Sequence, residues 1–271
     1  MTIRKRIGQI PWVVLLIVIA LIFMIPLIFM VSMSLRTNNT IGMPQLFVAD
    51  VTFKNYMNVL NQNPELWKNF MSSVIITGAS VALVTICSSM AVFGFSRKNV
   101  HGKVIIYNIL LCTLYVPIAG LVVPITQLNS RIGWINNYLG LIFPYTALGI
   151  PFAITILQGF MLGIPKDLEE AAVIDGCGIV RMFLKIICPL LKPGIVVIVI
   201  WQFLTSWNEF FLAMCTLTDN AIKTLPLVAQ QYNGTYFSQP GTLFAALTLI
   251  TIPMLVFYML VQKQFVKGLT A

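Results

Sequence analysis

The sequence predicts an all-α polytopic membrane protein with six transmembrane helices and a short cytoplasmic helix between the fourth and the fifth. Hydrophobic residues make up 58% of the 271 positions and charged residues only 9%, against roughly 25% charged residues in soluble domains. The mean hydropathy is +0.91. A soluble core of this size cannot hide so much apolar surface, so the surplus must face lipid.

The positions of the spans follow from the stretches that lack Asp, Glu, Lys and Arg, because a spanning helix needs about 20 mainly apolar residues. We expect the spans near 12–34, 70–95, 104–127, 138–162, 193–217 and 242–263. Residues 1–67 would hold one anchor span and an outer loop, and residues 68–271 the main transmembrane domain. The polar segment at residues 230–234 is expected to belong to an outer loop.

The first span is predicted to be a retained anchor rather than a cleaved signal peptide. Its apolar run continues to Met33, well beyond the typical h-region of about 7–15 residues, and no Ala-x-Ala cleavage site follows.

The orientation follows from the basic residues, which favour the cytoplasmic side. Of the 17 Lys and Arg residues, five fall in one set of connecting segments: Arg36, Lys54, Lys68, Arg131 and Lys223. The other twelve fall in the termini and in the segments after the second and fourth spans. We therefore expect both termini and the 163–192 loop in the cytoplasm. Because orientation accounts for the net charge of +9, we expect no nucleic-acid partner.

The chain offers no cofactor site of its own. Its five cysteines are scattered and it has a single histidine, so neither a metal site nor a disulfide framework is expected. It also lacks the Gly-x-x-x-x-Gly-Lys-[Ser/Thr] loop that cradles ATP phosphates.

The 163–192 loop contains a segment with the marks of a short helix near 166–176. Pro165 suits a first helical position. Asp167, Glu169 and Glu170 place negative charge at the positive end of the helix dipole. Gly176 can adopt the left-handed conformation that ends a helix.

This helix would carry an apolar stripe formed by Leu168, Ala171, Ala172 and Val173, flanked by acids. A second amphipathic stretch with Arg181 and Lys185 follows, and Pro189 and Pro193 are expected to stop it. Small residues permit close approach and carboxylates can meet Arg or Lys on another protein, so the helix is suited to docking.

Three other interpretations of this helix are weaker. A helix lying on lipid headgroups would bring three acids against a negative inner leaflet. A DNA-binding helix-turn-helix does not fit between two spans. A hydrolase that used Glu169 and Glu170 as catalytic acids would need a histidine or nucleophile constellation, which the sequence lacks.

The run from Glu170 to Pro189 resembles the EAA motif of ABC importer permeases: Glu-Ala-Ala, three residues, Gly, nine residues, Ile, one residue, Leu-Pro. Glu170-Ala171-Ala172, Gly176, Ile186 and Pro189 match, and Cys188 stands where Leu is usual. The resemblance narrows to the carbohydrate-uptake permeases, the group that includes the maltose-type second subunit. It covers roughly residues 68–271 and extends over the segments 91–97, 102–103, 207–210, 224–226 and 264–270.

This resemblance implies a multi-pass permease of a bacterial cytoplasmic membrane that translocates a sugar or oligosaccharide. It implies a second homologous permease, two ABC ATPase subunits that bind ATP and Mg²⁺, and an extracytoplasmic solute-binding protein that delivers the sugar. It also implies that the short helix is the coupling helix, which docks on an ATPase through Leu168, Glu169, Glu170, Ala171, Ala172, Asp175 and Gly176.

Glu209 is the only acid inside an expected span, and an intramembrane ionisable residue indicates a functional site. A gating or structural role and direct sugar contact both remain open, since transporters bind substrate near the midplane. Aromatic faces and polar edges hold sugars, so further candidates for the substrate pathway are Tyr115, Tyr145, Trp201, Trp207 and Asn208. Anchoring at the lipid interface explains Trp and Tyr equally well.

Two competing functions have less support. An ion-coupled secondary transporter would need buried ionisable groups to carry the coupling ion, and Glu209 alone is thin support. A structural or sensor subunit would not need so acidic a docking helix. Within the importer class, the alternative solutes are polyols and glycerol phosphate.

Overall fold

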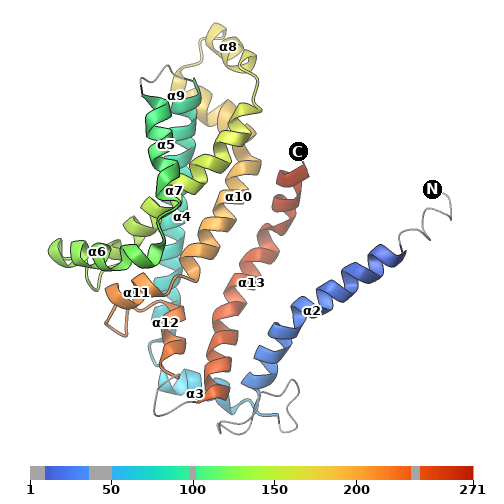
Figure 1. The fold of residues 1–271 in the computed structure, drawn as a ribbon, viewed down its shortest axis with the longest axis vertical. Coiled ribbons are helices and arrows are strands. Elements are labelled where there is room, and N and C mark those ends of the chain that lie inside the picture. Colours follow the sequence, from blue (N-terminus) through green and yellow to red (C-terminus); the bar gives the residue numbers. More distant parts are fainter. Residues whose placement is uncertain (1–9, 37–50, 98–101, 233–238, 271) are drawn as a thin grey trace. The chain divides into compact units, whose positions relative to one another are not determined.

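The computed structural model describes residues 10–36, 51–97, 102–232 and 239–270, and Figure 1 shows their arrangement. These residues form helices and no β-strand; a single antiparallel bridge joins Arg36 to Val51. In chain order the helices are α2 (Ile10–Ser34), α3 (Lys54–Gln62), α4 (Leu66–Arg97), α5 (Lys103–Thr113), α6 (Ile118–Arg131), α7 (Leu139–Leu162), α8 (Asp167–Ile174), α9 (Ile179–Met182), the π-helical segment η1 (Phe183–Ile187), α10 (Cys188–Trp207), α11 (Phe211–Thr216), α12 (Leu225–Gln230) and α13 (Pro240–Thr270).

The chain divides into two compact units. One unit comprises residues 1–64 and 228–252, and the other comprises residues 65–227 and 253–271. In the first unit, the side-chain amide of Asn55 on α3 donates hydrogen bonds to the carbonyl oxygens of Ser34 (2.9 Å) and Arg36 (2.8 Å). Ser34 is the last residue of α2, so the first of these bonds satisfies a carbonyl that the helix end leaves without a helical partner.

The second unit is built on α4, α7 and α10, which pack along one another (Figure 1). Lipid is as apolar as these side chains, so close packing rather than the hydrophobic effect holds such helices together. The buried side chains of this core are Val84, Val92, Ala153, Ile154, Leu157, Met161, Ile164, Ile187, Leu191 and Ile198. Helices α8 and α9 lie at one end of this bundle and α11 lies towards the other (Figure 1).

Five of the six expected spans are confirmed as single helical runs that are long and apolar enough to cross a membrane. They run over Pro11–Ser34, Leu66–Ser96, Leu139–Leu162, Ile179–Trp207 and Pro240–Gln262. Prolines inside α7 and α13 do not end these helices.

The third expected span, 104–127, is wrong as a single helix. Helix α5 ends at Thr113, and α6 begins at Ile118 at an angle of 101°. Pro117 has an extended backbone, with φ −67° and ψ 133°. Its ring disfavours a helical conformation of the preceding residue and it has no N–H to donate, so the helix breaks here.

The fifth expected span, 193–217, has wrong boundaries at both ends. The helical run extends from Ile179 to Trp207. Pro189 and Pro193 lie inside this run and do not stop it. Pro189 lies in the first turn of α10, directly after the π-helical segment η1. There its missing N–H costs little, because the wider π turn has already interrupted the regular hydrogen-bond ladder.

The segment expected as an outer loop before the last span is partly helical. Helix α12 (Leu225–Gln230) contains Gln230, and Tyr232 after it is buried. Residues 233–238 lie outside the described part of the chain.

Candidate functional site

Helix α8 ends in the way that its sequence predicts. Gly176 has φ +72°, the left-handed conformation that glycine adopts without steric cost. The N–H of Gly176 donates to the carbonyl of Val173 (3.0 Å) and the N–H of Cys177 donates to that of Ala172 (2.9 Å). This pair of bonds is a Schellman motif, which satisfies the last carbonyls of the helix.

The start of α8 differs from the expected 166–176 helix. The helix begins at Asp167, so Pro165 precedes it by two residues instead of occupying its first position. Its first turn carries the three acids Asp167, Glu169 and Glu170, as expected. Asp175 caps the other end rather than continuing the helix.

The apolar residues of α8 do not form one buried stripe. Ala172 is buried, with 5% of its surface exposed, whereas Leu168 is 44% and Ile174 85% exposed. Val173 is also exposed. Ala172 therefore anchors α8 to its own chain, and Leu168, Val173 and Ile174 present apolar surface outward.

A hollow of about 650 Å³ lies beside α8. Its wall includes Val173 and Ile174 of α8, Glu169 and Glu170 of the first turn, and Phe93 near the end of α4. Apolar side chains beside carboxylates make this end of the bundle suited to contact with another protein.

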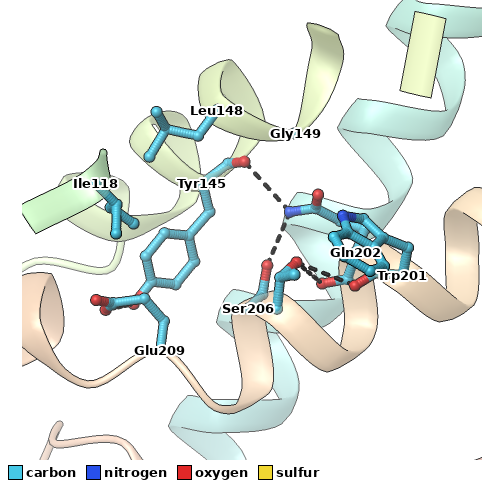
Figure 2. Close-up of a pocket in the computed structure, with 9 residues that line it drawn as sticks. Ile118, Tyr145, Leu148, Gly149, Trp201, Gln202, Ser206 and Glu209 are labelled. Atoms are coloured by element: carbon cyan, nitrogen blue, oxygen red, sulfur yellow. Dashed lines mark hydrogen bonds between the residues drawn. The ribbon is translucent and has the colours of Figure 1, made fainter. Parts of the chain in front are cut away.

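A second candidate site lies between α7, α10 and the start of α6, where a cavity of about 180 Å³ opens (Figure 2). Its lining combines an apolar part with aromatic and polar side chains, which is typical of small-molecule sites. The lining residues are Ile118, Tyr145, Leu148, Gly149, Trp201, Gln202, Thr205, Ser206 and Glu209.

Glu209 lies in the break between α10 and α11, so the expectation that it lies inside a spanning helix is wrong. Its carboxylate accepts three hydrogen bonds. They come from the hydroxyl of Tyr145 (2.6 Å) and from the backbone N–H groups of Leu212 (2.9 Å) and Ala213 (3.0 Å). A carboxylate that satisfies the first N–H groups of α11 favours the start of a new helix here.

Gln202 holds the other side of the cavity. Its side-chain N–H₂ group donates to the carbonyl of Tyr145 (3.2 Å) and to the hydroxyl of Ser206 (2.8 Å). Gly149 makes room for it, since a Cβ at position 149 would overlap the Gln202 amide and lie 2.9 Å from Val84. Figure 2 shows Tyr145 held at its backbone by Gln202 and at its ring by Glu209.

The structure brings together only three of the six residues predicted for the substrate pathway. Tyr145, Trp201 and Glu209 line the cavity. Tyr115 lies 88% exposed in the turn between α5 and α6. Trp207 is buried against Phe203 and Phe70, and Asn208 does not line the cavity.

Gln202, Thr205, Ser206 and Gly149 were missed from the sequence. Gln202 and Ser206 are polar residues four apart in an apolar span, which puts them on one helix face. That spacing could have identified both residues as candidates for the site. No sequence pattern could have identified Gly149, because its role depends on how closely α10 approaches α7.

The structure and sequence define a polytopic membrane protein with a short helix, acidic in its first turn, between two of its spans and a polar cavity among the spans. Residues 84–271 match the family described as binding-protein-dependent transport system inner membrane component, and the chain belongs to this family.

Relatives of known name agree with this membership. A putative ABC transporter permease protein of Caldicellulosiruptor sp. (strain Rt8B.4) is 34% identical over 81% of this chain and 79% of its own length. The trehalose transport system permease protein of Mycobacterium tuberculosis is 31% identical over 89% of this chain and 88% of its own length.

A solved structure shares the fold. A chain of a bacterial ABC transporter involved in the import of the acidic polysaccharide alginate superposes with a TM-score of 0.78 at 23% identity. The match covers 98% of this chain and 99% of that one.

Proposed function

We propose that this chain is the permease subunit of an ATP-driven importer that moves a sugar or oligosaccharide delivered by a solute-binding protein. The family membership supports the transport role. The trehalose relative, similar over nearly its whole length, supports a carbohydrate as the solute.

The observation that carries the proposal is helix α8. It is a short helix between two long spans, and its first turn holds three acids. Leu168, Val173 and Ile174 on it are exposed. Exposed apolar residues rimmed by charge mark a protein–protein contact rather than a membrane contact.

The partners follow from this role. The ATPase that receives α8 is a separate chain and binds the ATP and Mg²⁺, because this sequence has no phosphate-binding glycine loop. A second homologous permease completes the pathway, and each permease docks on one of two ATPase subunits. Both termini and α8 face the cytoplasm, in keeping with the distribution of basic residues.

Uptake into proteoliposomes tests the proposal. The complex of this chain with its second permease, ATPases and binding protein is reconstituted, and trehalose, maltotriose and raffinose are offered as radiolabelled solutes. We expect ATP-dependent accumulation of at least one of them. The matched control is an ATPase variant that lacks its catalytic glutamate, which must abolish uptake. Accumulation driven by a sodium or proton gradient without ATP would contradict the proposal.

A further inference from the structure

We infer that the cavity between α7 and α10 binds a neutral, hydroxyl-rich sugar ring and rejects anionic sugars such as uronates and sugar phosphates. The inference rests on the proposed function, because it takes the solute to be a carbohydrate. It adds a binding site to this chain and a charge class to the solute.

Most of the hydrogen-bond donors around the cavity are already engaged within the chain; the indole N–H of Trp201 and the hydroxyl of Ser206 are the further donors in its lining. The hydroxyl proton of Tyr145 goes to Glu209, and the side-chain N–H₂ group of Gln202 donates to the Tyr145 carbonyl and to Ser206. The hydroxyl of Thr205 donates to backbone carbonyl oxygens one turn earlier in α10. What these groups can still offer a ligand is acceptor capacity.

The charge of the cavity also favours a neutral ligand over an anionic one. None of the described residues that line it is Lys, Arg or His, and Glu209 is an acid. A carboxylate or phosphate on the ligand would bring a second negative charge into a region without a compensating cation, which is unfavourable away from water. Sugar hydroxyls can donate to the acceptors at no such cost.

A cationic ligand is less well served than a neutral one. Both oxygens of Glu209 already accept hydrogen bonds, three in all. Three of the roughly four lone-pair sites of the carboxylate are thus occupied, which leaves an ammonium group at most one direct hydrogen bond to Glu209.

Trp201 supplies the apolar face that a sugar ring needs. Its side chain is 47% exposed, and Phe152 stacks on it with ring centroids 4.5 Å apart and an interplanar angle of 25°. The stacking fixes the plane of the indole. Trp201, Ile118 and Leu148 form the apolar part of the lining, and Gln202 and Glu209 lie at its polar edge (Figure 2).

Protection of an engineered cysteine tests the site. Thr205→Cys places a thiol on the lining of the cavity. The assembled complex is treated with a small polar thiol reagent in the nucleotide-free and in the vanadate-trapped state. The rate of labelling at this cysteine is quantified by peptide mass spectrometry. Trehalose, maltotriose and raffinose are the neutral probes. Trigalacturonate and sn-glycerol 3-phosphate are the anionic probes, and glucosamine is the cationic one. Asn220→Cys, exposed and outside the cavity, is the control.

We expect a neutral sugar to slow labelling of Thr205→Cys in one of the states by the factor 1 + [L]/Kd, about threefold at twice the Kd. Anionic probes and glucosamine should leave the rate unchanged, and no probe should alter Asn220→Cys. In the Glu209→Gln background, which keeps an acceptor for Tyr145 and removes the charge, trigalacturonate should begin to protect.

Three results would overturn the inference: protection by anionic or cationic probes equal to that by neutral sugars, no protection by any neutral sugar, or no labelling of Thr205→Cys in either state. Its failure is separable from that of the proposed function. A complex that accumulates a neutral sugar without protecting Thr205→Cys leaves the importer function standing and removes only this site. A complex that accumulates none of the sugars removes the proposed function itself.

Discussion

The hydroxyl of Tyr145 on α7 donates a 2.6 Å hydrogen bond to the carboxylate of Glu209, just after α10. Helix α7 precedes α8 in the chain and α10 follows it after α9 and η1, and this bond joins α7 to the end of α10 at the ends remote from α8 (Figure 1). A displacement of α8 would therefore reach the cavity as a joint movement of two helices rather than a separate movement of each.

Tyr145→Phe should weaken this connection between α7 and the end of α10, because it removes the hydroxyl that donates to Glu209. A hydrogen bond to a charged acceptor contributes about 1.5–3 kcal/mol and one between neutral groups about 0.5–1.5 kcal/mol. The matched control is Tyr138→Phe, which removes a 2.8 Å bond between the Tyr138 and Ser72 hydroxyls. Thermal unfolding of the purified complex should show the larger loss for Tyr145→Phe. Equal losses, with unchanged uptake, would mean that the Tyr145–Glu209 bond has no special role.

Gly149→Ala should destabilise the contact between α7 and α10. The added methyl group would overlap the Gln202 amide, which cannot move freely because it is bonded to Tyr145 and Ser206. Overpacking of this kind costs about 1–3 kcal/mol. The control is Gly159→Ala on the same helix, where no atom lies within 4 Å of the new Cβ. A melting temperature lowered equally by both substitutions would contradict the packing argument.

Gly176→Leu should uncouple ATP hydrolysis from transport while leaving the protein inserted. The positive φ of Gly176 disfavours a side chain by about 1–2 kcal/mol, too little to unfold the bundle but enough to disturb the end of α8. We expect normal abundance, lost uptake, and ATPase activity that no longer responds to the loaded binding protein.

Two variants calibrate that experiment. Gly178→Leu adds the same side chain two residues later at φ −66°, again with open space around it, and should retain uptake. Gly176→Asn should retain part of the activity, because Asn tolerates the left-handed region. Wild-type uptake by Gly176→Leu would show that the end of α8 does not couple ATP hydrolysis to transport.

Fusions of a reporter enzyme should place the two termini on the same side and the 35–67 segment on the other. The physical reason is the excess of Lys and Arg in the termini and in the 163–192 loop. A cytoplasmic signal from a fusion within residues 35–67 would contradict this topology.

Much of the fold was predictable, because long charge-free stretches identify spans and need no tertiary information. The end of α8 was predictable for a local reason, since a glycine after an amphipathic run specifies its own backbone conformation. The helix breaks at Pro117 and after Trp207 were not predictable from the sequence. Pro253, like Pro117, lies in an expected span, but it leaves its helix unbroken, so the outcome depends on neighbouring contacts.

The cavity was only partly predictable for the same reason. Glu209 and Tyr145 were conspicuous as an acid and an aromatic residue in apolar sequence, and they proved to be partners. Trp207 was equally conspicuous but packs into an aromatic cluster. Gln202 became significant only when the approach of α10 to Gly149 fixed its orientation.

The accessibility of Leu168 shows whether α8 docks on an ATPase. Leu168→Cys and Ile174→Cys, both at exposed positions, are labelled with a membrane-impermeant maleimide in inside-out vesicles, before and after the ATPase is stripped. The control Ala172→Cys, which is buried in the chain itself, should label poorly in both conditions. We predict that Leu168→Cys and Ile174→Cys are protected in the assembled complex and become reactive once the ATPase is removed. Equal, rapid labelling of Leu168→Cys with and without the ATPase would mean that α8 does not dock on it.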